Sequence, residues 1–187
     1  EDSKRDTMDA GGIGGKNLSV VIAEAKTAFS SCGGGEFEPD FIYVEGNGKV
    51  GKRVFGPSDI TTAEELAPGK RFISLTLSEL NDRTTDYLER YPNKVVILKT
   101  FNKNGPAEQR AFFLKLKEKG IRNAVVIHRE YDETDMDSLT IKAAADCGLL
   151  FIDGMGDGIW LQNKNETISA VEIVRLSFCI SLVGLAC

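Results

Sequence analysis

Residues 94–128, KVVILKTFNKNGPAEQRAFFLKLKEKGIRNAVVIH, decide the fold, because they contain a strand, a helix and a second strand in one unit. Lys94–Thr100 and Ala124–His128 are short runs rich in β-branched residues, which are typical of strands buried on both faces. Between them the pattern predicts a helix over Pro106–Lys119, with proline in its first turn and glycine just after its end. The unit therefore predicts parallel strands that are joined by a helix.

The same unit recurs on both sides of this stretch. A strand at Phe72–Leu77 precedes a predicted helix at Glu79–Arg90, and a predicted helix at Asp135–Cys147 precedes a strand at Leu149–Ile152, with a further strand at Ile159–Leu161. We predict an α/β fold with a mostly parallel sheet of repeated βα units. A barrel of eight such units needs about 200–250 residues. At 187 residues the chain favours an incomplete or degenerate TIM-barrel-like fold, or an open sheet.

The first part of the chain is less regular. We predict a polar, glycine-rich linker over residues 1–17 and one α/β domain over residues 18–187. The run Gly11–Gly15 could be a phosphate loop, but no strand is predicted before it and Lys16-Asn17 departs from the Gly-Lys-Ser/Thr ending. A helix over Leu18–Phe29 and a hairpin formed by Phe41–Val44 and Val50–Phe55 complete this part of the prediction.

The composition excludes several classes of function. A formal net charge of −5 argues against a nucleic-acid partner, since neutralising phosphates requires a basic face. The apolar run Ile173–Cys187 is too short for a membrane span, which needs about 20 residues. The four cysteines lack metal-site spacing, and Cys147 and Cys179 are expected to be buried free thiols in a cytoplasmic protein.

The last stretch of the chain, Ile168–Cys187, is predicted to form a helix with two apolar stripes. A helix that is apolar on more than one side must be covered on more than one side. We therefore expect it to pack both on its own domain and on another part of a longer polypeptide, of which this chain would be a fragment.

Two residues at predicted strand ends are candidates for chemistry. His128 could be a general base or a phosphate contact, or a polar residue that only bonds to backbone. Lys99 could form a Schiff base, or it could be a solvated lysine at a strand end. With no nucleophile or paired carboxylate beside them, these residues do not define a reaction.

The segment Asp153-Gly154-Met155-Gly156-Asp157-Gly158 is the third candidate. Asp153 and Asp157 could bind a hard cation through their oxygens, although the spacing misses the calcium-loop pattern. A tight turn that requires glycine explains the same residues. We predict no catalytic, cofactor-binding or metal-binding residue in this domain; His128, Lys99 and Asp153 are the candidates should it have a site.

Residues 147–161, CGLLFIDGMGDGIWL, with the later Leu176-Ser177-Phe178, resemble the insertion domain of three-domain hydroxymethylbutenyl diphosphate synthases. These are iron–sulfur enzymes of the non-mevalonate isoprenoid pathway, in which an extra α/β domain separates a substrate barrel from a cluster-binding domain. The resemblance covers roughly residues 71–187 and also includes Val125–His128. It implies that Asp153–Leu161 is a diverged copy of a barrel segment, with Trp160 in place of an anion-binding arginine.

The resemblance implies a function for a larger protein. Its [4Fe-4S] cluster would be bound by cysteines beyond Cys187, and ferredoxin or flavodoxin would supply two electrons to a cyclic methylerythritol diphosphate. The present domain would be inactive alone and would position the cluster domain over the substrate barrel. Its partners would be those flanking domains, with no nucleic acid or membrane. The alternative is an autonomous α/β enzyme that acts on a phosphorylated metabolite through His128, Lys99 and Asp153.

Overall fold

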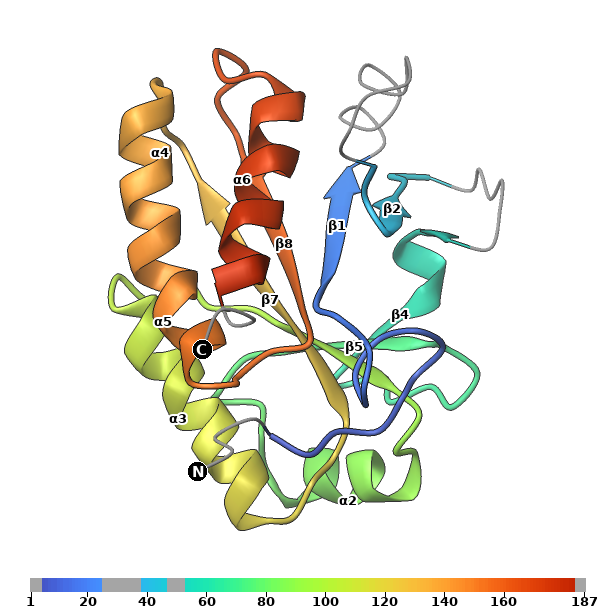
Figure 1. Cartoon of the computed structure of the whole chain (residues 1–187). Helices are drawn as coiled ribbons and strands as arrows, with labels where there is room; N and C mark the ends of the chain where they lie inside the picture. The colour runs from blue at the N-terminus through green and yellow to red at the C-terminus, as the bar shows by residue number, and fades with distance from the viewer. Residues whose placement is uncertain (1–4, 25–37, 47–52, 184–187) are drawn as a thin grey trace.

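The computed structural model describes residues 5–24, 38–46 and 53–183 as an eight-stranded parallel sheet with helices outside it (Figure 1). The strands are β1 (Val20–Glu24), β2 (Phe41–Tyr43), β3 (Val54–Phe55), β4 (Ile60–Thr62), β5 (Phe72–Leu75), β6 (Val95–Leu98), β7 (Ala124–Tyr131) and β8 (Gly158–Asn163). The helices are η1 (Pro57–Asp59), α2 (Asp82–Arg90), α3 (Gly105–Glu118), α4 (Met136–Ala143), the π-helix η2 (Ala144–Gly148), α5 (Leu149–Ile152) and α6 (Ala170–Val183).

The strand order is that of a barrel with one open seam. Every ladder is parallel, and the order runs β3-β2-β1-β8-β7-β6-β5-β4, so the first and the last strand of the chain pair with each other. Such a circular order defines a (β/α)₈ barrel. Among the described residues no ladder joins β3 to β4, which leaves the barrel open at that point. The prediction of an incomplete TIM-barrel-like α/β fold is confirmed.

Alternation along the strands divides the apolar core into an inner and an outer layer. The inner layer fills the barrel with aromatic and aliphatic side chains, and the outer layer packs under the helices. The inner layer includes Val20, Ile22, Phe41, Phe55, Phe72, Val95, Ile97, Ala124, Val126 and Trp160. The barrel interior is therefore a packed core.

The residues predicted as a linker, from Arg5 onward, lie against the amino-terminal ends of the strands. The Ile13 side chain is fully buried in the inner layer and covers that end of the barrel. The Met8 N–H donates to the Arg122 carbonyl at 2.8 Å, and Gly11, Gly12, Gly14 and Gly15 all have positive φ. This looped segment carries no phosphate-loop geometry, because a helix does not follow it; strand β1 does.

Three elements differ from the prediction. Leu18–Glu24 contains strand β1, whereas a helix was predicted there; residues 25–29 lie outside the described residues. β2 and β3 pair in parallel, with Ile42 opposite Val54, so the predicted hairpin is wrong. Leu149–Ile152 is helix α5 and continues α4 through the π-helix, so the strand predicted there is also wrong.

Helices α4, α5 and α6 cover the outside of β7, β8 and β1 (Figure 1). One stripe of α6 is buried by the domain itself, through Ile173, Leu176 and Ile180, and Val174 is buried as well. On its other side Leu182 is 51% exposed, and Cys179, predicted to be buried, is exposed. No helix in residues 5–24, 38–46 and 53–183 is long and apolar enough to cross a membrane.

Candidate functional site at the mouth of the barrel

Polar side chains gather where the inner face reaches the carboxyl ends of the strands. β7 and β8 pair with His128 opposite Trp160 and Glu130 opposite Gln162. The register of β6 and β7 places Leu98 opposite Ile127, so Lys99 follows on the inner face beside His128. The carboxyl ends of parallel strands carry the sites of barrel enzymes, so this mouth is the candidate site.

The His128 side chain is held by two residues of neighbouring strands. Its Nε2 bonds to Oε1 of Gln162, and the amide nitrogen of Gln162 donates to the carboxylate of Glu24. An ionised carboxylate only accepts, which fixes the direction of the Gln162 amide, so Nε2 of His128 is the donor. His128 thus bonds to a side chain and not to backbone.

Burial lowers the pKa of His128 from 6.5 to about 4, although the bond to Gln162 raises it. The imidazole is therefore neutral at neutral pH, with its proton on Nε2 and a lone pair on Nδ1. A neutral His128 could act as a base. Among the described residues, however, no hydroxyl or thiol nucleophile lies within hydrogen-bond distance of its ring. The geometry gives a positioned, uncharged ring.

Trp160, the one tryptophan of the chain, lies next to His128 in the barrel. Its ring packs at 4.7 Å from His128, at 4.8 Å from Tyr43 and at 5.8 Å from Phe55, measured between ring centroids. It is 3% exposed, and its indole N–H has no acceptor among the described residues. Burying a donor without an acceptor costs about 1–3 kcal/mol.

Lys99 and His128 line the same hollow, which has a volume of about 220 Å³. Within the described ranges no hydrogen bond or ion pair holds the Lys99 ammonium. Glu130, in the same hollow, pairs with Lys164 at 3.1 Å. Burial opposes ionisation of Glu130, but the bond from Lys164 keeps its pKa below the ordinary value. The other residues of the lining are Thr100, Phe101, Asn102 and Arg129.

Asp153 is not brought together with Lys99 and His128. Because residues 149–152 are helical, the segment that follows them enters β8 at its amino-terminal end, on the opposite face of the barrel from the mouth. Asp153 forms an exposed ion pair with Arg110 there. The expectation that the segment 153–158 follows the carboxyl end of a strand is wrong.

Asp157 bonds within the protein. Its carboxylate accepts from the Val125 N–H at 2.9 Å and from the Thr7 hydroxyl at 2.7 Å, and Arg5 lies close enough to interact with it electrostatically. Gly156 has a φ of +101°, and an added Cβ would lie 2.8 Å from the Ile127 side chain. The aspartates and glycines of this segment therefore form a structural turn that attaches the amino-terminal segment to the barrel.

Sequence reasoning missed a second polar cluster, on the outer face of β7. Arg129 pairs with Asp146 of the π-helix, and the Tyr131 hydroxyl donates to the same carboxylate at 3.1 Å. Burial raises the pKa of Tyr131, and burial raises the pKa of Cys147 to about 12. A thiol with that pKa stays protonated, so Cys147 is structural, as its apolar surroundings predicted.

Gln162 and Glu24 were also missed by sequence reasoning. Alternation along Gly158–Asn163 could have found Gln162, because it places Trp160 and Gln162 on one face. Glu24 was hidden by the helix predicted over its segment.

The described residues do not fit an iron–sulfur cluster. Such clusters are held by several cysteine thiolates. Cys147 belongs to the π-helix and is fully buried, while Cys179 is exposed on α6. Among residues 5–24, 38–46 and 53–183 no three histidine, cysteine or acidic side chains are grouped so that they could hold a metal ion. No step of chemistry is therefore assigned to a metal in this domain.

Fold and site together define a class of protein: an incomplete barrel of βα units with a filled interior and a small polar mouth. The chain is 35% identical to 4-hydroxy-3-methylbut-2-en-1-yl diphosphate synthase (flavodoxin) of Parabacteroides distasonis, over 95% of this chain and 32% of that protein. The enzyme of the same name from Phocaeicola vulgatus is 32% identical over 97% of this chain and 33% of its own length. The enzyme of that name from Bacteroides thetaiotaomicron is 30% identical, over 90% of this chain and 31% of that protein. No family model matches the chain.

The chain is homologous to one segment of the 4-hydroxy-3-methylbut-2-en-1-yl diphosphate synthases, and the predicted resemblance to this family is confirmed. It spans about a third of the length of the curated relatives that it matches.

Proposed function

We propose that this chain is the structural insertion domain of a reductive synthase that makes 4-hydroxy-3-methylbut-2-en-1-yl diphosphate from a cyclic methylerythritol diphosphate. One observation carries the proposal: the relatives match nearly the whole of this chain, but the match takes up only about a third of each of them. This partial match supports the proposal that the chain is one unit of a larger enzyme. The proposal places the [4Fe-4S] cluster and the substrate in the other parts of that enzyme, and the chain in the cytoplasm.

The packing of the barrel supports an architectural role. Among the described residues its interior is filled by buried side chains that include Phe41, Phe55, Phe72 and Trp160. Its helices and strands share two continuous apolar layers, which makes the domain a stiff body. In the proposed enzyme this body spaces the cluster domain over the substrate barrel, with flavodoxin, named with the relatives, or ferredoxin as the electron donor.

The first test measures cluster binding by the chain alone. After anaerobic reconstitution with iron and sulfide, we expect no visible cluster absorbance and no turnover of the cyclic diphosphate. Absorbance that corresponds to about one cluster per chain would contradict the assignment of the cluster to other domains.

The second test uses a full-length relative, the Parabacteroides distasonis synthase. Removing the segment that matches this chain should leave cluster absorbance in place and should lower turnover by at least about 100-fold, because spacing between reacting groups controls the rate steeply. Replacing that segment by residues 5–183 of this chain should restore turnover. If the deleted enzyme keeps its turnover, the segment is not a spacer.

A further inference from the structure

The lining of the hollow at the mouth of the barrel holds more cations than carboxylates; the nearby Glu24 and Glu108 lie outside this lining and are bonded to Gln162 and Thr100. Lys99 and Lys164 both act on the carboxylate of Glu130, and one carboxylate does not balance two ammonium groups. Arg129, which also lines the hollow, is already paired with Asp146. His128 is neutral, so it offsets neither sign. A concave wall with net positive charge attracts small anions.

Two hydrogen-bond donors on the inner face have no acceptor among the described residues. The Lys99 ammonium, at the end of β6, has no acceptor in the part of the chain that the structure describes. The buried indole N–H of Trp160, on β8, has none there either. At the rim, Oδ1 of Asn102 accepts from the Asn104 N–H at 3.0 Å, which leaves the amide NH₂ of Asn102 as a further donor. Unpaired donors favour a ligand that carries hydrogen-bond acceptor atoms.

An exposed aromatic side chain stands at the same rim. Phe101 is 83% exposed and lines both the hollow of Lys99 and a second hollow next to it. Leaving a phenylalanine in water forgoes the free energy that its burial would supply. The side chain is placed to cover the carbon part of a small ligand whose charged end reaches Lys99.

We propose that this mouth hollow, formed by Lys99, Asn102, His128 and the rim residue Phe101, binds a compact oxyanion, either a phosphate or a small carboxylate. Its volume of about 220 Å³ is below the usual range of pockets for drug-sized molecules, about 300–1,000 Å³, so the ligand is small. The site concerns binding by this chain itself. Its test does not depend on the role that is proposed for the domain in a larger enzyme.

The single tryptophan makes the binding measurable without activity. In a ¹H–¹⁵N spectrum the chain gives one indole cross-peak, from Trp160, whose ring lies 4.7 Å from His128. We would titrate the chain with inorganic phosphate, with succinate and with sodium chloride at equal ionic strength. We expect a saturable shift with phosphate or with succinate, and only a small linear drift with chloride. The anion that saturates identifies the source, and no saturable shift with either would overturn the proposal.

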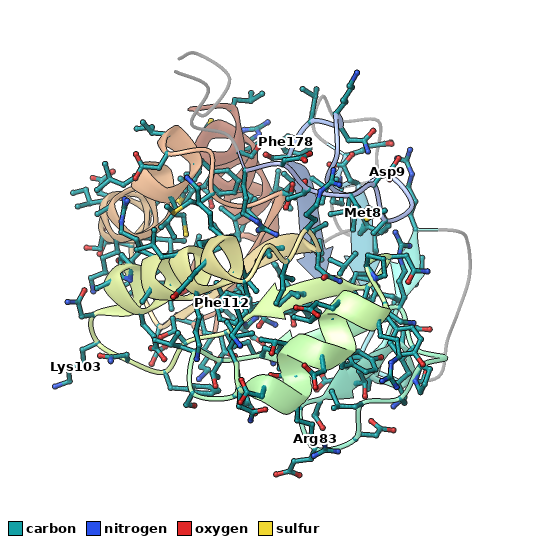
Figure 2. The ribbon with its side chains drawn as sticks, turned by 90° about the horizontal axis from the view of Figure 1, so that it is seen from below. Met8, Asp9, Arg83, Lys103, Phe112 and Phe178 are labelled. Carbon is teal, nitrogen blue, oxygen red and sulfur yellow. The ribbon has the colours of Figure 1, made fainter. Side chains whose placement is uncertain are left out.

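A matched pair of variants tests the role of Lys99. Lys103 belongs to the same loop, but its side chain points away from the protein into solvent (Figure 2). Lys99→Gln and Lys103→Gln therefore remove the same charge, one inside the hollow and one outside. We expect Lys99→Gln to weaken binding at least about tenfold, as loss of a charge-assisted hydrogen bond does, and Lys103→Gln to leave it within about twofold. Equal binding by Lys99→Gln and the parent chain would refute the site.

A variant at the rim keeps the test valid if Lys99→Gln does not fold. The Phe101 side chain is 83% exposed, so Phe101→Glu leaves the core intact, which circular dichroism and the urea midpoint would verify. The new carboxylate repels an anion at the rim, and we expect binding to weaken at least about threefold. Unchanged binding by Phe101→Glu would place the anion elsewhere and overturn the proposal.

Discussion

Substituting Ile13 by alanine tests whether the amino-terminal segment is part of the barrel. The Ile13 side chain is fully buried in the inner layer, although it lies in a stretch that reads as a polar linker. The substitution removes three carbons, and at about 0.8 kcal/mol for each the transfer term is about 2.4 kcal/mol. The cavity left behind adds to this, so we expect a loss of about 3–4 kcal/mol in the free energy of unfolding.

The matched control is Leu18→Ala, directly after that segment. The Leu18 side chain is 64% exposed, so its removal should change the free energy of unfolding by less than about 0.5 kcal/mol. Urea unfolding followed by circular dichroism gives both values from the shift in midpoint at constant slope. In a thermal scan of a chain of this size, the Ile13 variant should melt about 6–16 °C lower. A loss no larger than that of Leu18→Ala would mean that residues 5–17 do not close the barrel, and the reasoning would fail.

Three further comparisons test the packing and the charges. Gly14→Ala should lower the free energy of unfolding in urea by about 2–4 kcal/mol, because an added Cβ would lie 2.7 Å from the Met8 carbonyl oxygen. Gly12→Ala has a similar positive φ but open space around it, so it should lower the free energy of unfolding by only about 1–2 kcal/mol. Because the folded state keeps His128 neutral down to a pKa of about 4, stability should fall between pH 6.5 and 4 by about 3 kcal/mol, and an otherwise folded His128→Gln variant should lack that part of the slope. Asp146→Ala, which removes the ion-pair partner of the largely buried Arg129, should cost up to about 3 kcal/mol, against less than about 1 kcal/mol for Asp153→Ala in its exposed ion pair.

The regular part of the fold was predictable because local pattern and burial agree there. β5, β6 and β7 are short apolar runs with amphipathic helices between them, and the structure places all three near the predicted residues. The run Leu149–Ile152 misled the prediction, since four consecutive apolar residues fit a strand or a buried helix equally well. In the structure Leu150 and Phe151 face the core while Leu149 is 57% exposed, which is a helical arrangement.

That one error also moved a candidate site to the wrong face. With a strand at 149–152, Asp153 would follow a carboxyl end and would lie beside Lys99 and His128. With a helix there, Asp153 belongs to the other end of the barrel. The pairing of His128 with Gln162 and Glu24 was not predictable in the same way, because it depends on β1 lying next to β8, a contact between segments more than 130 residues apart.

The filled interior makes the two proposed roles, a spacer and an anion-binding module, compatible with each other. Where Trp160, Phe55 and Phe72 pack across the barrel, ligand and solvent are excluded from its centre, and stiffness is gained. Polar side chains are then confined to the last inner-facing positions of the strands. Lys99 and His128 occupy such positions, so the anion proposed above would bind beside them without opening the core. A ligand at the mouth therefore leaves the shape of the domain unchanged, which is the property that a spacer requires.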